Sequence, residues 1–271
     1  MPAEVRKLSG VLITFNEEEK VESALESLAS VCDEIIVVDS FSTDRTPSIC
    51  RRFTDRVIQR EWPGYREQKQ FAADQARCEW ILSLDADERL SPELQGALVA
   101  WKESSAEEPV GFYLPRMTFF LGRWIRHTTW YPDWQLRLYR KSAGRWTGGH
   151  VHERVSVRGS TGRFDGHIHH YTYSSLSEYL QQLERFSELA ALDYRERGRT
   201  TGPVQMLFYP PFAFFKNFVV KAGFLDGVPG LVVSTLAATS TFFKLARLWE
   251  LQSEGRRGEE GSAGGIETEE P

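Results

Sequence analysis

A short apolar segment that ends in three carboxylates, residues 80–88, constrains the fold more than any other stretch of the chain. It is too short for a typical helix and is bounded by polar residues, so it predicts a buried strand of a parallel sheet. Ligands of such sheets bind outside the carboxyl ends of the strands, where Asp85 and Asp87 would emerge on the same side. We therefore predict a site there for Mg²⁺ or Mn²⁺, which could bridge the oxygens of a diphosphate. The alternative is an acidic loop before a helix capped by Ser91.

The residues that precede this segment favour the metal site, because they alternate between strand and helix patterns. Buried strands are predicted at residues 9–15, 34–39 and 56–59, and helices at residues 21–28, from Thr46, and at residues 65–77. Short connections between alternating elements are typical of a doubly wound, mostly parallel α/β sheet. The fold class is therefore α/β.

Several other classes of enzyme are disfavoured because the sequence lacks their motifs. No Gly-x-Gly-x-x-Gly follows the first predicted strand, and no Gly-Lys-Ser/Thr phosphate loop is present. Neither Gly-x-Ser-x-Gly nor His-Glu-x-x-His occurs. The sequence thus argues against NAD enzymes, P-loop NTPases, α/β-hydrolases and metalloproteases of the best-marked kinds.

Charge and cysteine content indicate which partners and which cellular compartment to expect. The net charge of −5 comes from the segment after residue 249, which carries seven Glu against two Arg. No basic stripe occurs in the N-terminal half, so we expect no nucleic-acid partner. Three widely spaced cysteines argue against a disulfide framework, and residues 1–8 lack the apolar segment of a secretory signal. These features predict a cytoplasmic protein.

The second half of the chain is predicted to extend the sheet with mixed or antiparallel strands at residues 111–120, 135–140 and 151–157. Between the first two lies an aromatic and basic region that suits sugar binding, with ordinary core aromatics as the alternative. Glu153 is expected beside His150 and His152 at a strand edge. The histidines of residues 167–170 are expected to be structural, because no third marked metal ligand accompanies them.

The C-terminal part changes composition after a predicted helix at residues 177–197, capped by Ser177. Residues 203–249 are rich in aromatic side chains and contain four basic residues but one acid, Asp226. The uncharged run at residues 228–243 is shorter than the ~20 residues of a membrane span. We expect helices that lie in an anionic membrane surface, with a hairpin packed on the domain as the alternative. Residues 250–271 are expected to be disordered.

Three motifs in the first half, taken in order and spacing, resemble family 2 glycosyltransferases with the GT-A fold. They are Val-Leu-Ile-Thr-Phe-Asn-Glu at residues 11–17, Val-Val-Asp-Ser at 37–40 and Leu-Asp-Ala-Asp at 84–87. Later motifs are similar to the lipopolysaccharide-core glucosyltransferase branch: Trp-Tyr-Pro-Asp at 130–133, Arg-Leu-Tyr-Arg at 137–140, Val-His-Glu at 151–153 and Gly-Phe-Leu-Asp-Gly at 223–227. The resemblance covers roughly residues 8–250.

The resemblance implies a nucleotide-activated sugar donor, commonly linked to UDP, and a role for each matching residue. Asp85 and Asp87 would hold Mg²⁺ or Mn²⁺ on the diphosphate, and Asp39 would accept a hydrogen bond from the base. The chain departs from many members by having Asp39-Ser40 in place of two acids, and by lacking Gln-x-x-Arg-Trp. The other residues expected to bind the nucleotide-sugar are Thr14, Phe15, Glu17 and Lys69.

The resemblance also implies an inverting transferase, because members of the family invert the anomeric centre; that mechanism needs a carboxylate to take the proton of the acceptor hydroxyl. Glu153 is favoured for this role and Asp133 is the other candidate. The expected reaction moves a sugar, with glucose as the expected one, from a UDP-sugar to a lipid-linked glycan such as lipopolysaccharide core. It would take place on the inner face of the cytoplasmic membrane, where the enzyme is peripheral. A sugar-nucleotide-binding protein without transferase activity and a nucleotidyltransferase are the alternatives.

The expected domains are a GT-A domain at residues 1–200, a helical membrane-associating segment at 203–249 and an acidic tail at 250–271. Within the first, residues 1–102 would bind the nucleotide and residues 103–200 the acceptor.

Overall fold

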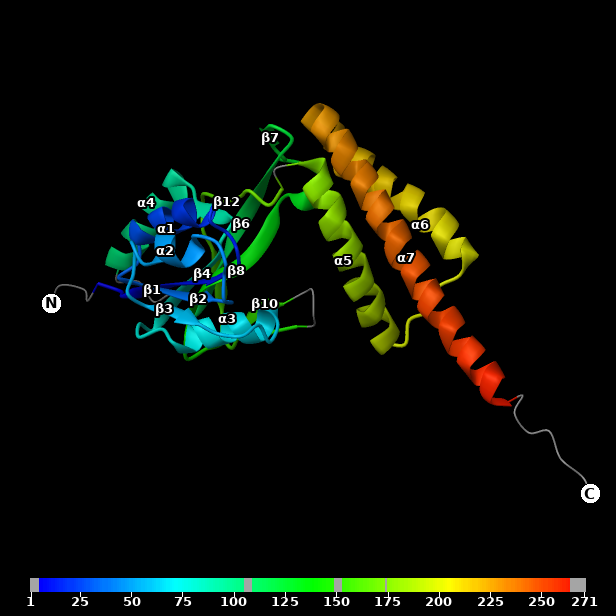
Figure 1. Ribbon diagram of the computed structural model, residues 1–271. Helices are drawn as coiled ribbons and strands as arrows, with labels where there is room; N and C mark the ends of the chain where they lie inside the picture. Colours follow the sequence, from blue (N-terminus) through cyan, green and yellow to red (C-terminus); the bar gives the residue numbers. More distant parts are fainter. Residues whose placement is uncertain (1–4, 105–108, 149–152, 174, 264–271) are drawn as a thin grey trace, which may run out of the picture. The chain divides into compact units, whose positions relative to one another are not determined.

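Four parallel strands predicted from the sequence lie side by side in the computed structural model (Figure 1). The structure describes residues 5–104, 109–148, 153–173 and 175–263. Pairing in the order β3-β2-β1-β4 places the carboxyl ends of these strands at one edge of the sheet. Their bounds are β1 (Leu8–Thr14), β2 (Glu34–Asp39), β3 (Val57–Gln59) and β4 (Trp80–Asp85).

Side chains of this sheet alternate between two cores, one on each face. Leu12 of β1 and Leu82 of β4 lie in one core with α1 (Val21–Ala29), α2 (Thr46–Cys50) and α4 (Pro92–Glu103). Val11 and Ile81 lie in the other core, with alanines of α3 (Tyr65–Asp74). Helices therefore cover both faces, which confirms the doubly wound arrangement. Because Asp85 follows Ile81 by an even number of residues, its side chain falls on the α3 face.

Antiparallel strands extend the sheet beyond β4, as predicted. Strand β8 (Asp133–Arg140) pairs antiparallel with both β4 and β6 (Gly111–Phe120). Two short strands that the sequence did not predict, β12 (Ile168–His170) and β5 (Glu88–Leu90), complete the order β4-β8-β6-β12-β5. Two more, β7 (Arg123–Trp124) and β11 (Thr161–Arg163), pair with β6, and the 3₁₀-helix η1 (Thr128–Trp130) follows β7.

A separate two-stranded sheet pairs β9 (Gly144–Thr147) with β10 (Arg154–Val157). The strand predicted at residues 151–157 thus begins at Arg154. Residues 149–152, which include His150 and His152, lie outside the described residues. Glu153 directly precedes β10, so the pairing with β9 fixes the backbone that carries it.

The chain divides into two compact units between residues 174 and 175, and helices form the described part of the second. Their bounds are α5 (Leu176–Glu196), α6 (Pro203–Phe215), the π-helix η2 (Lys216–Val220), the 3₁₀-helix η3 (Gly223–Asp226) and α7 (Gly227–Ala263). Helix α5 groups with α7, whereas the sequence placed it in the acceptor half of the first domain. The contact is specific, because the Lys244 ammonium donates to the Tyr194 hydroxyl at 3.0 Å.

Two expectations for this unit were wrong. The cap of α5 is Ser175, whose hydroxyl accepts from the Glu178 N–H at 3.1 Å, and not Ser177. Helix α7 continues to Ala263, so the expected disorder after Glu250 does not hold for residues 251–263. Residues 264–271 lie outside the described residues.

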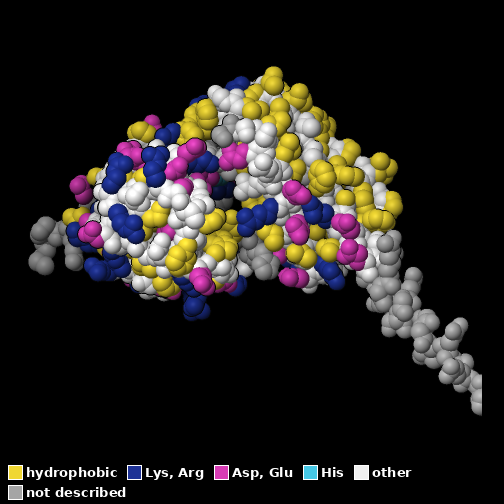
Figure 2. Space-filling model, viewed as in Figure 1, with side chains coloured by type: hydrophobic (Ala, Val, Ile, Leu, Met, Phe, Trp, Pro, Cys, Tyr) yellow, Lys and Arg dark blue, Asp and Glu magenta, His cyan; other side chains and the backbone are white. Residues whose placement is uncertain are grey.

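The second unit exposes many large apolar side chains, which Figure 2 shows gathered over α6 and α7. Phe212 of α6 and Val228 of α7 are 65% and 71% exposed. By length and composition, the segment Gly223–Glu254 is apolar enough to cross a membrane, although its strictly uncharged run is shorter. The other large apolar side chains exposed in residues 203–249 are Val204, Leu207, Phe208, Tyr209, Phe215, Val219, Val220, Phe224, Leu225, Leu231, Phe242, Phe243 and Trp249.

Candidate active site

The paired carboxylates at the end of β4 lie where the sequence predicted them, but in different surroundings from each other. Asp85 Oδ1 lies 2.8 Å from Lys69 Nζ, and its Oδ2 lies 2.6 Å from Arg137 Nη2. Burial alone would raise the pKa of Asp85, but the two cations outweigh it and hold that pKa well below its usual range. Asp85 is therefore an ionised carboxylate with a cation at each oxygen.

Asp87 instead contacts a histidine. Its Oδ2 lies 3.2 Å from His170 Nε2, because β12 pairs with β5 and sets His170 opposite Glu88. Burial would raise the pKa of Asp87, but His170 outweighs it and lowers that pKa. His170 was expected to be structural and was not among the predicted site residues. Its only sequence signal was the cluster of three histidines at residues 167–170.

The two candidate bases contact different cations. Glu153 Oε1 lies 2.9 Å from Lys69 Nζ, and the Glu153 side chain is 14% exposed. Asp133 Oδ2 lies 2.6 Å from Arg116 Nη2, and its Oδ1 accepts from the Gln135 amide at 2.7 Å. Both carboxylates are thus positioned by partners rather than free in solvent.

An ion-paired series joins these groups. Arg137 Nη2 contacts Glu88 Oε1 at 2.8 Å as well as Asp85, and Arg116 Nη1 contacts the same Glu88 oxygen at 3.1 Å. Glu88 is 1% exposed and Arg137 3%, so the middle of the series is fully buried. In order, the series runs Glu153, Lys69, Asp85, Arg137, Glu88, Arg116 and Asp133.

The residues expected around the nucleotide base form a second cluster, at the ends of β1 and β2. Asp39, fully buried, accepts hydrogen bonds from the Thr14 hydroxyl at 3.0 Å and the Ser42 N–H at 3.0 Å. The Glu17 N–H donates to Thr46 Oγ1 at 2.8 Å, and Phe15 is 56% exposed. Phe15 follows Thr14 in the chain, so an exposed aromatic ring lies at the end of β1, and such rings can stack on a nucleotide base.

Helix α3 connects the two clusters. The Gln68 amide donates to Ser40 Oγ at 3.1 Å, next to Asp39, while the neighbouring Lys69 contacts Asp85 and Glu153. Lys69, which was expected near the nucleotide, therefore lies at the paired carboxylates. A small cavity of about 180 Å³ adjoins Asp87 and is also lined by Lys20 and Tyr171, among other residues.

Comparison with known proteins gives a consistent set of relatives. Residues 9–224 match the family described as Glycosyl transferase family 2. An uncharacterized glycosyltransferase of Rickettsia bellii (strain RML369-C) is 30% identical over 257 residues, covering 91% of this chain and 87% of that protein. The lipopolysaccharide core biosynthesis glycosyltransferase LpsC of Rhizobium meliloti (strain 1021) is 29% identical over 250 residues, covering 90% and 92%.

Among solved structures, the chain is similar to the mannosyltransferase PcManGT from Pyrobaculum calidifontis in complex with GDP-Man and Mn²⁺. The two are 15% identical with a TM-score of 0.48, over 95% of this chain and 82% of that chain.

Proposed function

Because the chain belongs to glycosyl transferase family 2 and has its GT-A fold, we propose that it is an inverting transferase that acts on a UDP-sugar. The proposed reaction moves glucose to a lipid-linked glycan such as lipopolysaccharide core, and the relative LpsC supports this choice of acceptor. The observation that carries the proposal is that Asp85 and Glu153 share Lys69 at the carboxyl end of β4, while Asp87, two residues after Asp85, pairs with His170.

The donor set at Asp87 fits a divalent ion. Asp87 Oδ2 and His170 Nε2 lie 3.2 Å apart, so both could contact one ion at about 2.0–2.2 Å. Among the described residues no group of three or more His, Cys, Asp or Glu could hold a metal. Two protein ligands suffice, however, where substrate phosphates and water complete the shell, as is usual for Mg²⁺. The ion, when bound, would supply positive charge to the departing diphosphate.

Asp85 is less suited to contact that ion directly, because each of its oxygens already has a cation within 2.8 Å. We therefore assign the direct contacts to Asp87 and His170. Asp85 would then orient the donor and stabilise Lys69 and Arg137 in their charged forms.

In the proposed transfer, the acceptor oxygen attacks C1 of the donor sugar from the face opposite the diphosphate. The bond between C1 and the diphosphate oxygen breaks, and the acceptor proton passes to the carboxylate of Glu153. Glu153 is preferred over Asp133 because it shares Lys69 with Asp85 and is less exposed. Asp133 is bound by both Arg116 and Gln135, which suits a structural carboxylate.

A donor panel tests this proposal. UDP, UDP-glucose and GDP-mannose are each added with Mn²⁺ or with EDTA, and thermal unfolding and sugar transfer are measured. We expect UDP compounds to raise the unfolding temperature only with metal, because a ligand that binds the folded state stabilises it. Asp87→Ala should lose that metal-dependent shift, and transfer with it. Protection of the variant equal to that of wild type would contradict the metal assignment, and protection without transfer or donor hydrolysis would indicate a binding protein.

The second unit is proposed to associate with an anionic membrane surface on the cytoplasmic side. Its exposed apolar side chains are accompanied by the exposed basic residues Lys216 and Lys221, while the one acid of residues 203–249, Asp226, is buried. Helix α6 continues directly into η2, and this exposed segment of residues 203–220 contains Pro210, Pro211 and Lys216, whereas a membrane span needs ~20 predominantly apolar residues. This favours helices that lie in the interface over a single span.

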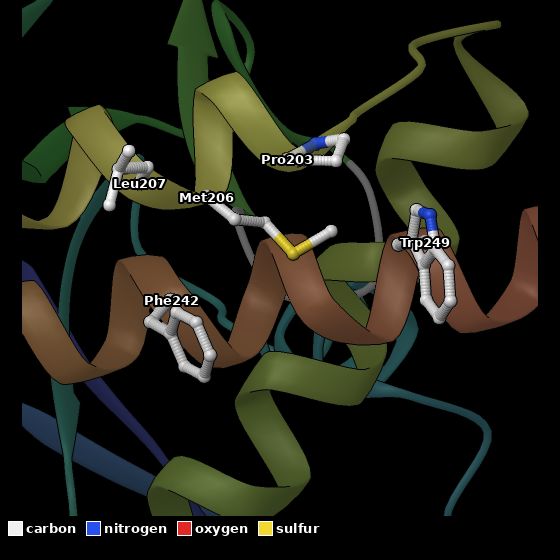
Figure 3. A pocket seen from close by; sticks show the side chains of 5 residues that line it. All are labelled: Pro203, Met206, Leu207, Phe242 and Trp249. Atoms are coloured by element: carbon white, nitrogen blue, oxygen red, sulfur yellow. The ribbon is translucent and has the colours of Figure 1, made fainter.

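An apolar groove of about 420 Å³ runs between α6 and α7 within this surface (Figure 3). Pro203, Met206 and Leu207 line it from α6, and Phe242 and Trp249 line it from α7. Phe242 and Trp249 are two helical turns apart and so share one face of α7. Apolar walls on both sides support contact with lipid tails.

A further inference from the structure

We propose that Lys69 is a positioning residue for the transfer reaction. Its ammonium group holds the carboxylate of Glu153 at a fixed distance from Asp85, the residue proposed to orient the donor. The inference rests on the proposed function, since it takes Glu153 as the base. Its basis is one ammonium group between two carboxylates, with Nζ 2.8 Å from Asp85 Oδ1 and 2.9 Å from Glu153 Oε1.

Lys69 has a buried side chain that is held by neighbouring residues. It lies on the buried side of α3, its side chain is 7% exposed, and its Nζ lies 5.0 Å from the centre of the Trp146 ring of β9. Burial alone would lower the pKa of Lys69, but Asp85 and Glu153 outweigh it and raise that pKa. The ammonium is therefore charged and fixed before any substrate arrives.

The two carboxylates depend on Lys69 to different degrees. Asp85 also contacts Arg137 at 2.6 Å, and Arg137 is in turn fixed by Glu88. Within the described residues, by contrast, no second ion pair holds Glu153. Removal of the ammonium should therefore release Glu153 while leaving Asp85 in place.

The contact with Lys69 leaves the Glu153 carboxylate able to accept a proton. A carboxylate offers about four lone-pair sites on two oxygens, and Lys69 uses one of them on Oε1. The remaining sites can take the proton of the acceptor hydroxyl. Lys69 need not touch the reacting atoms; it sets the distance from the base to the donor, to which transfer rates are very sensitive.

The test compares wild type with Lys69→Met, Lys69→Arg and Glu153→Gln, and with Lys69→Met/Glu153→Gln. Lys141→Met is the matched control, because the Lys141 ammonium binds the Asp74 and Ala76 carbonyls at the end of the same helix. For each protein, kcat and KM for transfer, the Kd for UDP with Mn²⁺, and the unfolding temperature are measured.

We expect Lys69→Met to lower kcat by about 10²-fold, the scale of a 1 Å misplacement, with little change in the Kd for UDP. Lys69→Arg should recover much of the kcat, because a guanidinium can contact both carboxylates. In the double variant Lys69→Met should add little to the loss caused by Glu153→Gln, since residues that act as a unit are not additive. Lys141→Met should transfer at the wild-type rate.

Two results would overturn the inference. A loss in the double variant equal to the product of the single losses would mean that Lys69 acts independently of Glu153. A weaker UDP Kd with unchanged kcat in Lys69→Met would make it a donor-binding residue only. If Lys69→Met proves unstable, the pair Lys69→Gln and Lys69→Gln/Glu153→Gln gives the same cycle, because the amide also removes the positive charge. Full activity of Glu153→Gln is a separate outcome that would refute the proposed base itself.

Discussion

Lys69, Arg137 and Arg116 each lie between two carboxylates, so the series holds one more acid than cation and every cation in it is already paired. Breaking a buried ion pair costs about 3–5 kcal/mol, because the remaining charge is left unpaired. The series is thus rigid, but it has no positive charge to spare for a diphosphate. At the scale of single residues, this shortage is the physical reason to expect a metal at Asp87 and His170.

Substitution of each candidate base by its amide distinguishes their roles. Glu153→Gln should cut turnover by at least ~10²-fold, the usual scale for loss of a general base, because an amide cannot take the acceptor proton. The affinity for UDP should persist, as the amide keeps the size of the side chain. Steady-state transfer assays and calorimetric titration with UDP measure both quantities.

Asp133→Asn is the matched comparison, since it also exchanges one carboxylate of the same series for an amide. We expect a modest effect on turnover. The opposite ranking, with Asp133→Asn inactive and Glu153→Gln active, would exchange the two roles.

Most of the candidate site could be predicted from the sequence because strand ends mark it. Asp39 and Asp85 each close an apolar strand, and parallel pairing necessarily brings such ends to one edge. His170 could not be predicted in the same way. It meets Asp87 through the pairing of β12 with β5, two three-residue strands whose register no pattern in the sequence specifies.

At the scale of elements, the turn of η3 packs closely on the start of α7. A Cβ on Gly230 would lie 1.8 Å from the Gly223 carbonyl oxygen, so this glycine is required for the close approach. We predict that Gly230→Ala destabilises the second unit by about 1–3 kcal/mol or more, because the clash is with backbone. Far-UV circular dichroism during urea unfolding would report the loss.

Gly96→Ala in α4 is the control, because nothing lies within 4 Å of its would-be Cβ. That change should be neutral or stabilising by about 0.4–1 kcal/mol. Equal stability of the Gly230→Ala and wild-type proteins would show that η3 can move away from α7 without cost.

Asp33 joins the start of β1 to the end of α4 and gives a prediction for pH dependence. Its Oδ2 accepts from the Leu8 N–H at 2.8 Å and lies 2.7 Å from Lys102 Nζ. Burial would raise the pKa of Asp33, but Lys102, the Leu8 N–H and Lys7 outweigh it and lower that pKa. A carboxyl group with a lowered folded-state pKa stabilises above its unfolded pKa of about 3.9, and this contribution is lost as the pH falls through the folded-state value.

We therefore expect Asp33→Asn to reduce the free energy of unfolding by about 1–2 kcal/mol at pH 7, with a difference that shrinks as the pH falls below the unfolded pKa of about 3.9 and through the lower folded-state pKa. Urea unfolding at several pH values measures it. Asp55→Asn, at an exposed surface position, is the control. If the difference in free energy of unfolding between Asp33→Asn and wild type stayed constant down to pH 3, the ionised form of Asp33 would not be what links β1 to α4.

Element boundaries in the C-terminal part were harder to predict than the sheet. Ser175 and Ser177 are both reasonable caps, and the side chain that reaches a free N–H decides between them. Likewise, Gly and Glu in residues 250–263 indicate disorder by composition, but the preceding apolar turns of α7 allow the helix to continue.

For the whole molecule, the exposed apolar surface of the second unit predicts membrane association. The protein should sediment with anionic vesicles and be only partly released by salt, because each basic residue contributes roughly 1 kcal/mol while each buried Phe contributes ~1.5–3 kcal/mol. The double variant Phe208→Ser/Phe212→Ser, at positions 62% and 65% exposed, should sediment far less.

Val99→Ser/Leu121→Ser is the control, because these side chains are exposed in the first unit at 43% each. It should sediment like wild type, and the unfolding temperature of each variant checks that the fold persists. Sedimentation of wild type that is the same with and without vesicles would show that residues 203–249 do not bind lipid.

The exposed side chains of α6 and α7 also bear on enzyme kinetics. An enzyme held on a bilayer would meet a lipid-linked acceptor by diffusion in two dimensions, whereas its soluble donor arrives from three. Its rate would then follow the mole fraction of acceptor in the lipid rather than the acceptor concentration in the whole sample. Adding inert lipid to a fixed amount of acceptor would slow transfer by surface dilution, while the donor dependence stayed the same.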